Sequence, residues 1–173
     1  MSALEGPFAA ACVLLVVAGV YKLARPAATA GALAGVGWPS RLTAVRLLGV
    51  GELVLGATAL VTSHRALAAV VAAAYASFAL FVLVALLTGT PLQSCGCFGE
   101  TTTPPSMIHV LTNLAFVGVA GAVAIGGLPS LADVLADQPW AGVPFVLLVA
   151  VTVQLVYVLL TDLPRALRSV ELV

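Results

Sequence analysis

Five long runs of almost wholly apolar residues follow one another along this chain, and short segments between them hold most of the polar residues. Each run is long enough for an α-helix to cross a bilayer, which takes about 20 residues. Backbone groups in lipid must hydrogen-bond within their own segment, so the runs predict helices rather than strands. The predicted spans are Pro7–Leu23, Leu42–Thr62, Ala66–Thr88, Met107–Ile125 and Val143–Thr161.

Two connecting segments predict short helices of their own. Residues 24–41 are too short and too rich in Gly and Pro to cross a membrane, and they predict a small interfacial helix with Trp38 at headgroup level. Residues 126–142 predict a short amphipathic helix capped by Ser130, with Trp140 as a second interfacial anchor. The whole chain, 1–173, is therefore expected to be one all-α domain, an integral membrane helical bundle with a Cys-x-Cys loop between its third and fourth spans.

The composition of the chain indicates what surrounds the protein and which partners it can bind. Hydrophobic residues make up 62% of the chain and charged residues 8%, whereas soluble domains average roughly 25% charged residues. So few charges cannot cover a surface that faces water, so we expect the lipid bilayer as the surroundings. The net charge is zero and no basic run occurs, which excludes nucleic acid as a partner.

The distribution of positive charges predicts an orientation. Alternation of five spans places six of the seven Lys and Arg residues on one side of the membrane, with only Arg65 on the other. Positive residues favour the cytoplasmic side, which predicts an outside N-terminus and a cytoplasmic cysteine loop in a bacterial-type cytoplasmic membrane. The six residues are Lys22, Arg25, Arg41, Arg46, Arg165 and Arg168.

The stretch "SCGCFGE", residues 94–100, carries the clearest chemistry. Cys95 and Cys97 are close enough in sequence for the Cα separation of ~4.4–6.8 Å that a disulfide needs, and so small a ring would be strained and easily reduced. A redox pair is one interpretation. A soft metal such as copper or mercury, with Met107 or His109 as further ligands, is another. Two unrelated loop cysteines are the third. Cys12, inside the first span, is expected to pack in the core.

Polar residues inside the spans predict a pocket beneath this loop. Glu52 lies near mid-span, where a carboxylate costs ~2.5–3.5 kcal/mol, and it is expected to face the bundle interior. Arg46 lies six residues earlier on the same broad face but is poorly placed for a direct pair. His109 and Asn113 are one turn apart in the fourth span. His109 is expected to transfer protons to and from a thiol, and Asn113 to hydrogen-bond between helices.

The motif "CGCFG" before a membrane helix, Arg46 and Glu52 in "RLLGVGELVLG", and Asn113 after the cysteines together resemble the MauE-type proteins of methylamine utilisation, within the DoxX-like redox-associated membrane proteins. The resemblance implies four or five membrane helices. It also implies thiol–disulfide handling beside a thioredoxin-like partner, during maturation of an exported disulfide-rich protein. The redox motif of the family corresponds by position to Cys95 and Cys97, and its polar second-span residues correspond to Arg46 and Glu52.

The sequence thus favours a membrane thiol–disulfide oxidoreductase or its accessory subunit. Its Cys95 and Cys97 would exchange electrons with a thioredoxin-like or disulfide-bearing partner, assisted by His109, and a quinone is the candidate cofactor for the pocket of Arg46, Glu52 and Asn113. Two alternatives stay open. One is a soft-metal binding or transport protein that uses Cys95, Cys97, Met107 and His109, and the other is a non-catalytic subunit of a membrane complex.

Overall fold

The computed structural model describes residues 3–89 and 105–171, with side chains up to residue 163. Within these ranges the regular elements are all helical. In chain order they are α1 (Glu5–Ala24), α2 (Pro26–Gly35), α3 (Leu42–Thr62), α4 (Arg65–Leu87), α5 (Met107–Gly126), α6 (Leu131–Ala136), the single 3₁₀ turn η1 (Pro139–Gly142) and α7 (Val143–Glu171).

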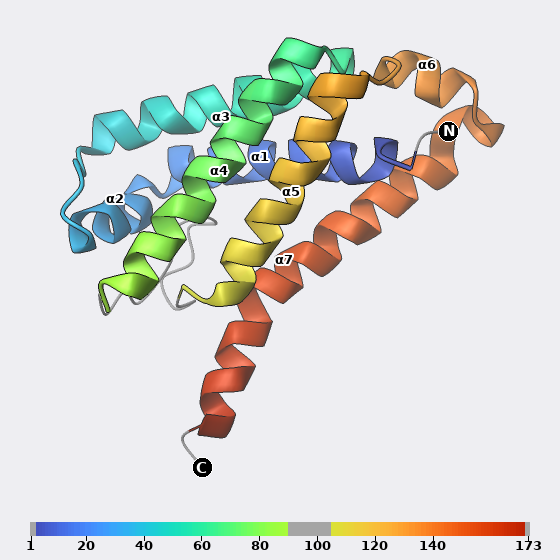
Figure 1. Cartoon of the computed structure of the whole chain (residues 1–173). Helices are drawn as coiled ribbons and strands as arrows, with labels where there is room; N and C mark the ends of the chain where they lie inside the picture. Colours follow the sequence, from blue (N-terminus) through green and yellow to red (C-terminus); the bar gives the residue numbers. More distant parts are fainter. Residues whose placement is uncertain (1–2, 90–104, 172–173) are drawn as a thin grey trace.

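The five predicted spans are confirmed as helices. In the described part of the chain, five helices are long and apolar enough to cross a membrane, namely α1, α3, α4, α5 and α7 together with η1 before it. The protein is therefore a multi-pass membrane protein. The bounds agree to within about two residues except at the end of the chain, where α7 continues past Thr161 to Glu171. Figure 1 shows the last turns of α7 projecting beyond the other helices.

Both short connecting helices are also present. α2 begins with Pro26 in its first turn, where the missing N–H of proline costs nothing. α6 begins with a reciprocal cap, because the Ser130 side chain accepts from the backbone N–H of Asp133 and the Asp133 carboxylate accepts from that of Ser130. Trp38 and Trp140 are exposed, as interfacial anchors would be, and the Trp38 ring also contacts Phe81 edge-on at 5.5 Å between centroids.

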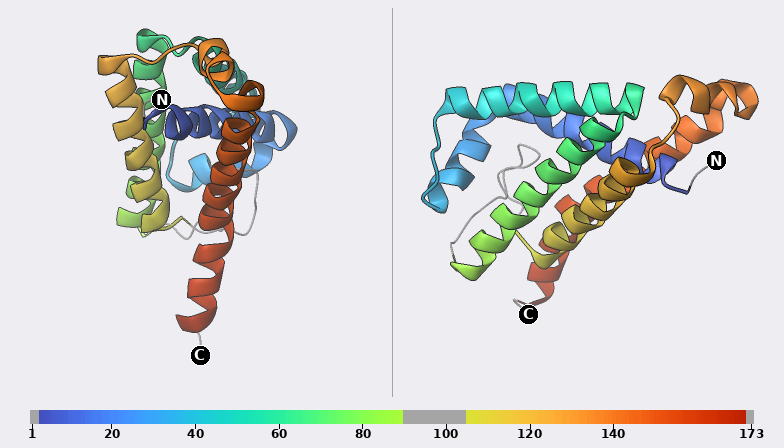
Figure 2. Two further views of the ribbon diagram at one scale, coloured as in Figure 1. Left: turned by 90° about the vertical axis from the view of Figure 1, so that its right-hand side faces the viewer. Right: turned by 45° about the horizontal axis from the view of Figure 1, so that its top comes forward.

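The helix α1 lies at the centre of the fold. It packs against α2, α3, α5 and α7, and it is the most buried of the five spans. The views agree that α1 and α3 run side by side, while α4 and α5 form a second antiparallel pair that crosses them (Figures 1 and 2). The main apolar core joins both pairs, with Leu15 of α1, Val71 of α4 and Val123 of α5 almost fully buried in it.

Three glycines let α1 and α3 approach each other very closely. A Cβ atom on Gly19 would lie 2.5 Å from the carbonyl oxygen of Gly49, and one on Gly56 would lie 2.6 Å from the carbonyl oxygen of Cys12. Both distances are shorter than real Cβ contacts, and both obstacles are backbone atoms. Small residues are typical of such membrane-helix contacts, because lipid provides no hydrophobic drive and the helices must gain from close packing.

Candidate functional site

A buried ion pair joins the two most closely packed helices. The Nζ atom of Lys22, in the last turn of α1, donates to Oε2 of Glu52 in the middle of α3 across 2.8 Å. The two side chains are 5% and 3% exposed, so Glu52 faces the bundle interior as predicted. Lys22 Nζ also lies 5.4 Å from the ring centroid of Phe78, within the range of a cation–π interaction. The pair therefore keeps both charges out of the lipid.

Lys22 was not identified from the sequence as a partner of Glu52. It was treated only as one of the positive residues that indicate the orientation in the membrane. A signal was present in the chain. "GVYK" at 19–22 and "GVGE" at 49–52 place a glycine three residues before each charge. The two glycines meet in the structure, since a Cβ on Gly49 would lie 2.9 Å from the Gly19 carbonyl oxygen and 3.0 Å from Lys22 Cβ. Matched glycine-to-charge spacing on two helices thus indicated their pairing.

Arg46 does not join this group. It lies on the exposed face of α3, whereas Glu52 is buried against α1. Six residues of helix rotate a side chain by about 120°, which is enough to separate the two faces. Glu52 therefore has Lys22, and not Arg46, as its charged neighbour.

His109 is buried at the start of α5. Its side chain is 1% exposed, and Nδ1 lies 2.9 Å from the hydroxyl oxygen of Ser106 just before the helix. The other ring nitrogen, Nε2, is buried and has no hydrogen-bond partner among the described residues. Buried polar atoms are seldom left unpaired in native proteins, so an unpaired imidazole nitrogen points to an exchangeable neighbour such as water or a reacting group.

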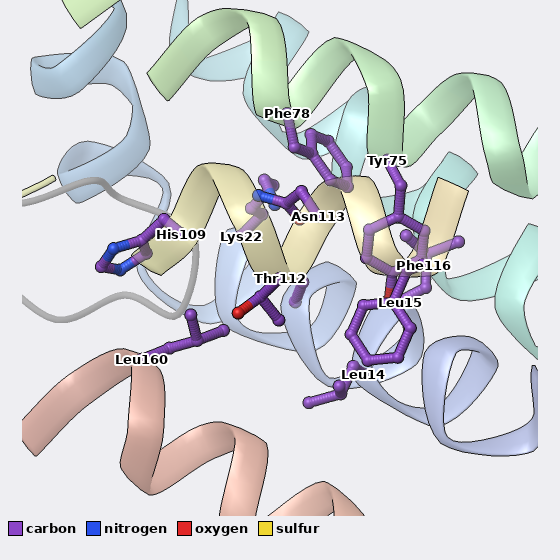
Figure 3. A pocket seen from close by; sticks show the side chains of 11 residues that line it. Leu14, Leu15, Lys22, Tyr75, Phe78, His109, Thr112, Asn113, Phe116 and Leu160 are labelled. Carbon is purple, nitrogen blue, oxygen red and sulfur yellow. The ribbon is translucent and has the colours of Figure 1, made fainter. Parts of the chain in front are cut away.

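Lys22, His109 and Asn113 line one cavity inside the bundle (Figure 3). Its walls come from α1, α4, α5 and α7, and the rest of its lining is apolar except for Thr112 and the Tyr75 hydroxyl. The remaining lining residues are Leu14, Leu15, Ala18, Phe78, Phe116 and Leu160. The cavity therefore has polar groups from α1 and α5 set against an aromatic and aliphatic wall.

The size of this cavity limits what it can hold. Its volume is about 40 Å³. That is room for a few water molecules, whereas an engineered cavity that holds one benzene ring measures about 150 Å³. A quinone ring does not fit between these residues as they stand.

Tyr75 fixes the aromatic wall of the cavity. Its hydroxyl donates to the backbone carbonyl of Ala11 across 2.6 Å, which ties α4 to α1. The Tyr75 ring lies 4.9 Å from the centroid of Phe116 and 5.8 Å from that of Phe78. Aromatic rings at such distances attract one another beyond the gain from burial. The tyrosine thus holds α1, α4 and α5 in register around the cavity.

The cysteine predictions fall partly outside the described residues. Cys95 and Cys97 lie outside the described residues, so the disulfide between them remains a prediction. Cys12 is confirmed as a core residue, fully buried and without a disulfide. For the metal alternative, Met107 is 54% exposed and His109 is buried, because residues two apart in a helix face different ways. No group of three His, Cys, Asp or Glu side chains suited to a metal occurs in the described ranges.

Comparison with known proteins completes the description of the site. The family model described as methylamine utilisation protein MauE matches residues 3–126, a range that contains α1 to α5 and the cysteine motif. Neither the curated proteins nor the solved structures include a match to the chain. Because the matched range covers far more than half of the 173 residues, this multi-pass membrane protein belongs to the MauE family.

Proposed function

We propose that this MauE-family protein is a membrane thiol–disulfide redox protein whose Cys95–Cys97 pair exchanges electrons with a thioredoxin-like or disulfide-bearing protein. The observation that carries the proposal is His109. The histidine is buried at the first turn of α5, the helix that follows the cysteine segment. It has an unpaired ring nitrogen, and it lines the cavity together with Lys22 and Asn113. An imidazole in such a place suits proton transfer to and from thiols.

The proposed exchange conserves electrons and protons. One thiolate of the pair attacks the disulfide of the partner, a mixed disulfide forms, and the first partner sulfur leaves as a thiolate. The second cysteine then attacks the mixed disulfide. Cys95 and Cys97 end as a disulfide, and the partner ends as a dithiol that has gained two electrons and two protons. His109 takes the proton from an attacking thiol and returns it to a leaving thiolate, and the relative reduction potentials set the direction.

The first test is an equilibrium redox titration. The protein, carrying Cys12→Ala so that two cysteines remain, is placed in lipid nanodiscs and equilibrated with glutathione buffers of graded potential. Mass spectrometry after thiol alkylation counts free thiols. We expect both thiols to appear and disappear together, at a potential above about −300 mV, the value below which structural disulfides lie. A pair that stays reduced throughout, or that is reduced only below that value, would refute the redox proposal.

The second test separates catalysis from an accessory role. We expect His109→Gln to slow reduction of oxidised glutathione by the dithiol form about 100-fold or more, in line with the usual contribution of a general base. The equilibrium potential should stay unchanged, since the histidine acts on the rate. His64→Asn, a change at the other histidine of the chain, which is exposed and caps α4, is the control and should leave the rate within a factor of two or so. Equal rates in both variants would remove His109 from the mechanism, whereas unchanged function after replacement of both Cys95 and Cys97 would favour a non-catalytic subunit.

A further inference from the structure

Several polar groups around the cavity have unused hydrogen-bonding capacity. Lys22 Nζ carries three N–H donors, and Glu52 accepts from one of them. His109 Nε2 has no partner among the described residues, and neither does Glu52 Oε1. The side chains of Asn113 and Thr112 also make no hydrogen bond to another described residue. Lys22 of α1 and His109, Thr112 and Asn113 of α5 line one small cavity, and Glu52 is joined to it through its ion pair with Lys22.

In a bilayer such groups need partners. A buried donor or acceptor that is left without a hydrogen-bond partner costs about 1–3 kcal/mol. A water molecule needs two to four polar neighbours and about 10–15 Å³ of free volume. The cavity supplies about 40 Å³, with Lys22, His109, Thr112 and Asn113 as polar neighbours. Water therefore satisfies both the groups and the space.

We propose that water in this cavity joins Nε2 of His109 to Nζ of Lys22, so that His109 and the Lys22–Glu52 pair form one buried proton-exchange site. The ammonium orients the water, which then donates to Nε2. His109 accordingly carries its own proton on Nδ1 and donates it to the hydroxyl oxygen of Ser106, 2.9 Å away. Asn113, one turn along α5 from His109, holds the water between the two ends.

The proton balance of the site is simple. The Lys22 ammonium first passes a proton to the Glu52 carboxylate, and the resulting amine then takes up, through water, the proton that a protonated His109 releases from Nε2. His109 and Glu52 end neutral, Lys22 remains an ammonium ion, and the total charge is unchanged. A role of the site as a store for the proton exchanged by the thiols rests on the proposed function. The coupling of His109 to the Lys22–Glu52 ion pair is independent of that function.

The titratable groups around the site are few. Among the described side chains, α1 supplies Lys22, α3 supplies Glu52, α4 supplies Tyr75 and α5 supplies His109. The Tyr75 hydroxyl is already donated to the Ala11 carbonyl, and α7 contributes Leu160 to the lining. A change in the state of His109 on altering Lys22 and Glu52 can thus be attributed to this pair.

The test observes His109 directly and needs no thiol activity. The chain has two histidines, and His64→Asn removes the other while retaining a side chain that caps α4. In this background, ¹⁵N-histidine NMR of the full chain in nanodiscs reports the tautomer of His109 at fixed pH. Lys22→Met combined with Glu52→Gln neutralises both charges together, which avoids leaving one charge buried and unpaired. We expect the tautomer ratio to move toward Nε2–H by about fivefold, the effect of one typical hydrogen bond.

Two further variants make the result decisive. Arg46→Gln changes an exposed charge on α3 and should leave the tautomer ratio as in the wild type. Asn113→Leu fills the cavity with an apolar side chain, so in that background the Lys22→Met/Glu52→Gln change should no longer move the ratio. An unchanged ratio in the charge-neutral variant, or the same change with and without Asn113→Leu, would overturn the water-linked site. Coupling without thiol exchange would refute the proposed function alone.

Discussion

A methyl group added at Gly56 should force α1 and α3 apart. The new Cβ would lie 2.6 Å from the carbonyl oxygen of Cys12 and 3.0 Å from the backbone nitrogen of Val16. Neither atom belongs to a side chain that can rotate away, so the helix axes themselves must move. The ion pair of Lys22 and Glu52 bridges the same two helices one turn earlier in α3, and its 2.8 Å contact depends on the same close approach.

The size of the effect follows from a comparison within one helix. Gly51 lies on the exposed face of α3, and a Cβ there meets nothing within 4 Å. Alanine is favoured over glycine in a helix interior by roughly 1 kcal/mol, and this gain applies to Gly51→Ala and Gly56→Ala alike. Overpacking at Gly56 costs typically about 1–3 kcal/mol, and more where backbone is the obstacle. The difference between the two variants in free energy of unfolding should therefore be about 1–3 kcal/mol or more.

The assay combines global and local readouts. Unfolding in mixed micelles of dodecyl maltoside and dodecyl sulfate, followed by circular dichroism, gives the difference in free energy of unfolding. Cys12 reports locally, because its fully buried thiol lies on α1 at this contact. In a background with Cys95→Ser and Cys97→Ser, maleimide should label Cys12 faster in Gly56→Ala than in Gly51→Ala. Equal stability and equal labelling of the two variants would show that the helices are not in backbone contact at Gly56.

Two further predictions concern the α1–α4 contact and the orientation in the membrane. Tyr75→Phe removes the hydroxyl that donates to the α1 carbonyl across 2.6 Å, so it should lower the free energy of unfolding by about 1–3 kcal/mol in the same assay, and a change below about 0.5 kcal/mol would show that this bond contributes nothing net. An impermeant maleimide should label Cys95 and Cys97 in inverted vesicles and leave them unlabelled in intact cells, because positive residues gather on the side of the cysteine loop. Labelling in intact cells would show that the orientation is the reverse of the predicted one. The prediction depends on the count of positive residues, and this count is weakened because one of them, Lys22, is buried against Glu52.

The spans and both short helices could be predicted from the sequence because their causes are local. About 20 consecutive apolar residues suffice to cross a bilayer, and a backbone in lipid must close its hydrogen bonds within its own helix. Glu52 could be predicted to face inward for a similar reason, since a carboxylate among lipid tails costs too much. The cysteine motif also stood out in the sequence, as two thiols one residue apart in a segment rich in polar residues.

The partner of Glu52 was decided by the tertiary structure. Lys22 and Arg46 are both positive and both lie in or beside the membrane, so charge and position along the chain did not indicate which of them Glu52 meets, and the matched glycine spacing was the one signal for Lys22. Which residue Glu52 pairs with depends on the rotation and depth of α1 against α3. The glycine contacts set both, through backbone packing between residues some 30 positions apart in the chain. The cavity has the same origin. Lys22, Tyr75, His109 and Leu160 come from four different helices, and only the packing of those helices brings their side chains around one space.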